Sequence, residues 1–118
     1  MSAAAKQALK NAVYRGLGES WGAVAPSREA RRVLRGLMYH KVDGRPGNPP
    51  AVPPALFAEQ MAFLRERGYP VVSLDAVLAH YRNGEPLPPR AVLITFDDGY
   101  RDNLERALPV LAEHGFPA

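Results

Sequence analysis

The stretch that decides the fold is Ala91-Val92-Leu93-Ile94-Thr95-Phe96-Asp97-Asp98-Gly99-Tyr100. Its first six residues form an apolar, partly β-branched run, which is typical of a strand buried on both faces of a parallel sheet. Two acidic residues follow this run directly. In parallel α/β proteins, side chains just beyond the carboxyl ends of strands line the active site. The stretch therefore predicts an inner strand that ends in a candidate functional site.

Two strand–helix units are predicted ahead of this strand, and one helix after it. Proline suits the first turn of a helix, serine an N-cap and glycine the position just past a helix end. By these signals the expected elements are a strand at 37–42, a helix from Pro53-Pro54 to a stop at Gly68, a strand at 69–73, and a helix capped by Ser73 that ends near Asn83-Gly84. Residues 43–50 are expected to form a loop, because glycine, proline and asparagine dominate them.

The last helix is expected over residues 102–114 with a stop at Gly115. Pro109 cannot lie inside a helix without the loss of a hydrogen bond, so a short turn should come first and the main helix should start near the proline. The helical spacing predicts that an apolar face points inward, made of Leu104, Ala107, Leu108 and Leu111.

Alternating strands and helices predict an α/β fold with parallel strands and right-handed crossovers. Three such units do not close a barrel, so the chain is interpreted as a truncated, N-terminal part of a larger domain. Residues 1–35 are expected to be a basic helical extension, with a helix over 3–17 and a second one after Pro26-Ser27. Residues 36–118 are assigned to the domain itself.

Charge and composition narrow the functional classes. Residues 1–41 carry eight basic and two acidic side chains, and the later residues carry seven basic and ten acidic ones. A solvated helical surface is the favoured interpretation, with contact to a membrane surface as the alternative. No aromatic residues interleave with the arginines at 28–35, so nucleic-acid binding is not expected. There is no cysteine, which excludes disulfides and thiolate metal sites but leaves the compartment open. There is no apolar run of membrane-spanning length and no convincing signal peptide, so a cytoplasmic protein is expected, or an extracytoplasmic one if its start is misassigned.

Asp97 and Asp98 are the first candidates for chemistry. Neighbouring residues of an extended segment point to opposite sides, so the two carboxylates should diverge and take different tasks. One can bind a divalent cation while the other takes a proton from water. The alternative is an Asp-Gly turn in which either residue caps the following helix.

His40 is the third candidate, because it follows the first predicted strand on the edge where Asp97 should also lie. It can be a general acid or a metal ligand, or else a histidine at the rim of the core with an ordinary hydrogen bond. His80 and His114 are late in their predicted helices and are expected to interact favourably with the helix ends.

Three stretches together resemble the start of NodB-type polysaccharide deacetylases, carbohydrate esterase family four. They are L-M-Y-H-K-V from Leu37, F-A-E-Q-M-A-F-L-R-E-R-G-Y-P-V-V-S-L-D from Phe57, and A-V-L-I-T-F-D-D-G-Y-R-D-N from Ala91. The resemblance covers about residues 37–118 and is strongest toward the branch that acts on poly-N-acetylglucosamine. It implies a distorted (β/α) barrel and hydrolysis of N-acetyl groups from an N-acetylated amino-sugar polysaccharide.

By this resemblance, Asp97 matches the catalytic base and Asp98 matches the aspartate ligand of a divalent metal, usually zinc. His40 matches a histidine that takes the place of the general acid in one branch of the family. The family completes its metal site with two histidines at H-x-x-x-H spacing. The three histidines of this chain do not have that spacing, so the 118 residues are expected to be inactive alone.

Two other functions are alternatives to deacetylation for this sequence. A non-catalytic remnant that binds glycan or a partner would share the same sequence but lack the downstream histidine pair. Phosphoryl transfer of the haloacid-dehalogenase type also uses aspartates after an apolar strand, but it needs them two residues apart on one side, whereas Asp97 and Asp98 are adjacent.

Overall fold

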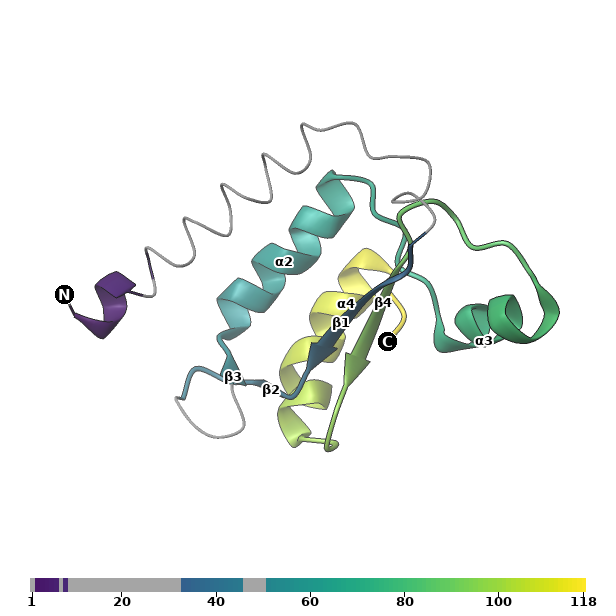
Figure 1. The fold of residues 1–118 in the computed structure, drawn as a ribbon. Helices are drawn as coiled ribbons and strands as arrows, with labels where there is room; N and C mark the ends of the chain where they lie inside the picture. The colour runs from purple at the N-terminus through teal and green to yellow at the C-terminus, as the bar shows by residue number, and fades with distance from the viewer. Residues whose placement is uncertain (1, 7, 9–32, 46–50) are drawn as a thin grey trace. The chain divides into compact units, whose positions relative to one another are not determined.

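The computed structural model describes residues 2–6, 8, 33–45 and 51–118 (Figure 1). The chain divides into two compact units, residues 1–31 and residues 32–118. In the first unit, residues 3–6 and 8 are helical, as predicted for the start of the 3–17 helix. The rest of that helix, the one predicted after Pro26-Ser27 and the loop residues 46–50 lie outside the described residues.

The second unit is built around two parallel strands, β1 (Arg35–Tyr39) and β4 (Val92–Phe96). Their register pairs Arg35 with Val92 at one end and Tyr39 with Phe96 at the other. Figure 1 shows the two arrows side by side and pointing the same way. Because both strands end at the same level, the residues that follow them, His40 and Asp97, are brought to one edge of the sheet.

The first predicted strand, 37–42, is divided in two. After β1 the chain bends at His40 and continues as β2 (Lys41–Val42), which pairs in parallel with β3 (Ala51–Val52). The uninterrupted strand was therefore a wrong prediction. Apolar residues lie before His40 and again at Val42, and no glycine or proline stands between them, so the pattern carries no sign of the bend.

Helix α2 (Pro54–Glu66) begins and ends as predicted. Pro53 occupies the N-cap position, and Gly68 follows the C-cap residue Arg67 with φ +66°. A positive φ is unfavourable for residues with a Cβ, which explains the glycine at this position. Phe57, Met61 and Leu64 form the buried face of the helix.

Residues 69–73 do not form the predicted second strand. Only Val71 makes a bridge, to Val92. The Val92 N–H donates to the Pro70 carbonyl and the Val72 N–H donates to the Val92 carbonyl. Pro70 has no N–H of its own and Ser73 already caps the next helix, so no room is left for a longer ladder.

Helix α3 (Leu74–Asn83) follows directly and agrees with the prediction. The Ser73 hydroxyl accepts a hydrogen bond from the Ala76 N–H at 3.2 Å. Gly84 closes the helix in the left-handed conformation, at φ +70°.

The last helical segment has two parts, as Pro109 predicted. A five-residue π-helix, η1 (Asn103–Ala107), precedes the α-helix α4 (Leu108–His114), and Pro109 lies in the first turn of α4. The proline has no N–H for the Glu105 carbonyl and its ring crowds that carbonyl, so the preceding turn widens. Gly115 ends α4 at φ +65°.

The core is packed between the β1–β4 pair, α2 and the η1–α4 segment. Its fully or nearly buried members come from all of these elements: Tyr39, Val42, Phe57, Met61, Leu64, Val92, Ile94, Ala107 and Leu111. One face of β4 carries the buried residues Val92 and Ile94, whereas Leu93 and Thr95 on the other face stay partly exposed. The prediction of burial on both faces of this strand was wrong for the described residues.

The inward face predicted for the last helix is confirmed for Ala107 and Leu111 and wrong for Leu104 and Leu108. Leu104 is 67% exposed and Leu108 is 49% exposed. The wider turn of the π-helix rotates the chain less per residue than an α-helix does, so apolar positions that align in a continuous α-helix are turned apart. No described helix is long and apolar enough to span a membrane.

Candidate active site

The candidate site lies at the carboxyl ends of β1 and β4. The Asp97 N–H donates to the Tyr39 carbonyl at 2.8 Å, which extends the β1–β4 ladder by one step beyond the strands. This bond holds the chain just before His40 against the chain that carries the two aspartates. The parallel register thus places all three predicted site residues together.

The His40 imidazole faces both carboxylates. Its Nε2 is 3.6 Å from Asp97 Oδ2 and 4.0 Å from Asp98 Oδ2. The three side chains are 27%, 44% and 58% exposed, respectively. The group is open to solvent, so a substrate and a water molecule can reach it.

The two carboxylates do not diverge, which corrects the prediction made from an extended backbone. Asp98 has φ +71° and Gly99 has φ +63°, so the chain leaves the strand conformation immediately after Asp97. The left-handed turn brings the Asp98 side chain round toward the histidine that Asp97 also approaches. A non-glycine residue at positive φ is unusual and is often found at functional sites.

Neither Asp97 nor Asp98 caps the helix that follows. The N-cap position of η1 is taken by Asp102. Within the described part of the chain, no backbone N–H of the following helix donates to Asp97 or Asp98. Both carboxylates are therefore available for chemistry at the sheet edge.

Asp102 and Asn103 belong to this neighbourhood, although the sequence did not single them out. Asp102 Oδ1 accepts from the Val42 N–H at 3.0 Å, and Asn103 Nδ2 donates to the His40 carbonyl at 2.8 Å. Lys41 also lies in this neighbourhood, with its ammonium 4.9 Å from the centre of the Tyr100 ring. One sequence signal could have found them: aspartate and asparagine favour the starts of helices, and here they follow closely behind Asp97 and Asp98.

Aromatic rings of the core pack together next to the strand ends that carry the site. Tyr39 stacks on Phe96 with ring centres 5.5 Å apart, and both contact Phe57. The Tyr39 hydroxyl donates to Gln60 Oε1 at 2.7 Å, and burial raises the pKa of Tyr39 to about 12. These rings fix the residues that immediately precede His40 and Asp97.

The described residues do not form a complete metal site. They contain no group of three or more histidine, cysteine, aspartate or glutamate side chains arranged to hold a metal ion. Asp98 can supply one oxygen ligand, whereas a catalytic zinc ion has three protein ligands. His80 and His114 lie in the last turns of α3 and α4.

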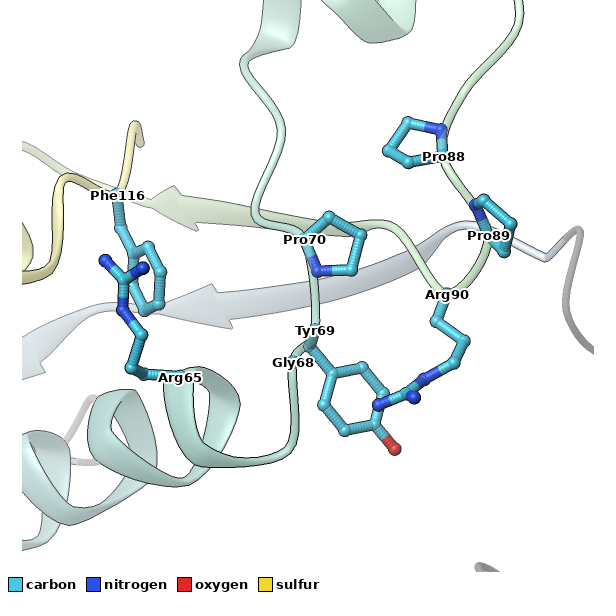
Figure 2. A pocket seen from close by; sticks show the side chains of 8 residues that line it. All are labelled: Arg65, Gly68, Tyr69, Pro70, Pro88, Pro89, Arg90 and Phe116. Carbon is cyan, nitrogen blue, oxygen red and sulfur yellow. The ribbon is translucent and has the colours of Figure 1, made fainter.

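A second hollow of the second unit, apart from the candidate site, is at the other end of β4. It has a volume of about 510 Å³, and Arg90, which precedes the strand, is among the residues that line it. Figure 2 shows the Arg65 guanidinium over Phe116 and that of Arg90 over Tyr69. The same arginines donate to the carbonyls of His114 and Arg67, at the ends of α4 and α2. Arginine here caps helix ends, so we do not place the chemistry in this cavity.

Comparison with known proteins finds polysaccharide deacetylases among the relatives of the chain. Residues 84–118 match the polysaccharide deacetylase family. Poly-beta-1,6-N-acetyl-D-glucosamine N-deacetylase of Escherichia coli (strain K12) is 47% identical over 60 residues, which are 51% of this chain and 9% of that protein.

Solved structures of similar proteins show the fold to which the chain corresponds. IcaB from Ammonifex degensii superposes with a TM-score of 0.63 at 33% identity, over 71% of this chain and 35% of that one. A de-N-acetylase from Aggregatibacter actinomycetemcomitans superposes with a TM-score of 0.66 at 27% identity, over 72% of this chain and 35% of that one. The chain therefore has part of the (β/α) barrel fold of these deacetylases and spans about a third of their solved length.

Proposed function

Because the chain carries part of a polysaccharide deacetylase domain of the NodB type, we propose that it serves in the hydrolysis of N-acetyl groups from an amino-sugar polysaccharide. The observation that carries the proposal is the meeting of His40, Asp97 and Asp98 at the carboxyl edge of two parallel strands. An N-acetylated polymer of glucosamine is the proposed substrate, by similarity to the named relatives.

We assign the base to Asp97. Hydrolysis of an acetamide requires a group that takes a proton from the attacking water and a group that gives a proton to the leaving amine. Asp97 is less exposed than Asp98 and lies nearer to His40 Nε2, at 3.6 Å. A carboxylate and an imidazole at this separation can serve the two proton transfers on one acetyl group. Acetate and a free amine are the products.

We assign the leaving-group proton to His40. In its protonated form, the imidazole can donate from Nε2 to the amine nitrogen as the carbon–nitrogen bond breaks. Its 27% exposure leaves the ring edge accessible from solvent. The same nitrogen lies 3.6 Å from Asp97 Oδ2, so the base and the acid lie on one side of the site.

Asp98 is proposed as one ligand of a divalent cation, for which zinc is the first choice. A cation so held would polarise the acetyl carbonyl. Two further ligands would have to come from residues outside those described. We therefore propose that the 118 residues alone release little or no acetate, and that the complete activity needs additional ligands.

The test is acetate release from an oligomer of β-1,6-linked N-acetylglucosamine by the full-length protein, with added zinc. We expect Asp97→Asn to lower kcat by roughly 10²- to 10⁴-fold, the usual contribution of a general base. Asp75→Asn is the matched control, because Asp75 is exposed in the first turn of α3. It should keep the wild-type rate.

Two outcomes would count against the proposal. A normal rate for Asp97→Asn would remove Asp97 from the role of base. Full-length protein that binds the oligomer but releases no acetate would favour a non-catalytic glycan-binding protein.

A further inference from the structure

The segment that carries the two aspartates also holds the chain around His40. Three backbone groups between residues 39 and 42 are bound by it: the Tyr39 carbonyl by the Asp97 N–H, the His40 carbonyl by Asn103 Nδ2, and the Val42 N–H by Asp102 Oδ1. We propose that Asn103, assisted by Asp102, is a positioning residue that sets the His40 imidazole against Asp97. The catalytic meaning of this placement rests on the proposed function.

The orientation of the Asn103 amide is fixed by its neighbours. Its Nδ2 lies 2.8 Å from the His40 carbonyl and 3.1 Å from Asp102 Oδ1. Both neighbours are acceptors, so only the NH₂ end of the amide can occupy this place. Asp102 in turn accepts from the Val42 N–H. The two side chains thus form one connected clamp on the bend at His40.

The bend needs such a clamp because the sheet does not hold it. β1 ends at Tyr39 and β2 begins at Lys41, so His40 lies between two separate sheets. Among the described residues, the Asn103 amide is the group that binds the His40 carbonyl. Without it, the bend loses the contact closest to the imidazole, and the ring direction is no longer set by the aspartate segment.

A purely stabilising role would not require an amide at residue 103. Asn103 Oδ1 is buried and has no hydrogen-bond partner in the described part of the chain. An unpaired oxygen in such a place is unfavourable, and an apolar side chain would avoid it. The donor end of the amide therefore explains why asparagine is suited to this position.

The test measures the contact between His40 and Asp97 by NMR in the 118-residue chain, without any assay of activity. Asp97→Asn is expected to displace the ring signals of His40, which are identified by their loss in His40→Gln. In an Asn103→Asp background the same change should leave these signals nearly in place. A carboxylate at residue 103 cannot donate to the His40 carbonyl and it repels Asp102, so the ring should move away from residue 97.

Matched variants separate positioning from stability. Asn83→Asp makes the same chemical change at an exposed helix end, and it should preserve the response of His40 to Asp97→Asn. If Asn103→Asp does not fold, the same response of His40 is measured in two variants of Asp102. Asp102→Asn keeps an oxygen for the Val42 N–H and should preserve the response, whereas Asp102→Ala should lose it.

The proposal is overturned if the response persists in folded Asn103→Asp, or in Asp102→Ala where only that variant folds. It is also overturned if Asp97→Asn leaves His40 unchanged in the otherwise wild-type chain, since there would then be no contact to position. These outcomes do not depend on acetate release. A failure of the proposed deacetylase activity therefore remains distinguishable from a failure of the clamp.

Discussion

At the scale of single residues, the backbone of Asp98 is the feature that organises the site. Its φ of +71° turns the chain so that two neighbouring carboxylates approach one imidazole nitrogen. A left-handed conformation is unfavourable for an L-residue by roughly 1–2 kcal/mol, although aspartate tolerates it better than most. Glycine would adopt it without strain, so the aspartate is explained by its carboxylate and not by the fold.

This strain gives a prediction for stability. Asp98→Gly should raise the free energy of unfolding by about 1 kcal/mol, because it relieves the backbone at φ +71°. Asp75→Gly, the same change in the first turn of helix α3, should lower it by about 0.5 kcal/mol, through lower helix propensity and loss of the carboxylate at the helix N-terminus. Urea unfolding of both variants measures the difference. Equal losses in the two variants would show that Asp98 is not strained.

Tyr39 gives a prediction for alkaline pH. Burial raises the pKa of Tyr39 to about 12 in the folded chain, above its ordinary value of 10.0. The unfolded chain therefore loses this proton first, so the contribution of Tyr39 to stability is complete below pH 10 and declines from about pH 10 to about pH 12. The slope should reach about 1.4 kcal/mol per pH unit at most.

The measurement is the free energy of unfolding in urea at about pH 9 and about pH 11, in wild type and in Tyr39→Phe. Lysines and the other tyrosines titrate in both proteins, so the difference between them isolates residue 39. We expect the variant to lose less stability over this interval. Parallel losses in the two proteins would contradict a buried, neutral Tyr39 hydroxyl.

At the scale of elements, the sequence predicted best where one local rule governs a boundary. Pro53-Pro54 and Gly68 delimit α2, Ser73 and Gly84 delimit α3, and Pro109 divides the last helix. These residues act through their own backbone or a hydrogen bond within four residues. Such rules need no knowledge of the rest of the chain.

The errors arise where distant parts of the chain decide. The bend at His40 depends on bonds from Asp102 and Asn103, some sixty residues later. The 69–73 segment has a strand-like composition, but its neighbour offers it only a bridge at Val92. That the site residues share one edge of the sheet was predicted, because it follows from two parallel strands. Their mutual orientation and the clamp were not predicted, because both depend on residues that are distant in the sequence.

The N-cap of α3 allows one of the local rules to be tested. Ser73→Ala removes the acceptor for the Ala76 N–H and should lower the free energy of unfolding by about 1 kcal/mol. Ser73→Asp keeps an acceptor and should stay close to wild type. Thermal or urea unfolding of the two variants checks this. An alanine variant as stable as the aspartate variant would mean that the cap does not hold α3.

At the largest scale, the packed core of the second unit connects the fold to the chemistry. Tyr39, Phe57 and Phe96 contact one another, and two of them directly precede His40 and Asp97. Phe57 of α2 thus packs against both strands that end in the site. The chain shares this part of the barrel with deacetylases of which it spans about a third.

The most direct test of the account is a double-mutant cycle on acetate release by the full-length protein. Asp97→Asn and His40→Gln are each expected to lower kcat by roughly 10²-fold or more. If the two residues act as one unit on the same acetyl group, the double variant should lose little more than the worse single variant. Losses that multiply in the double variant, or a wild-type rate for Asp97→Asn, would contradict a shared catalytic site at the edge of β1 and β4.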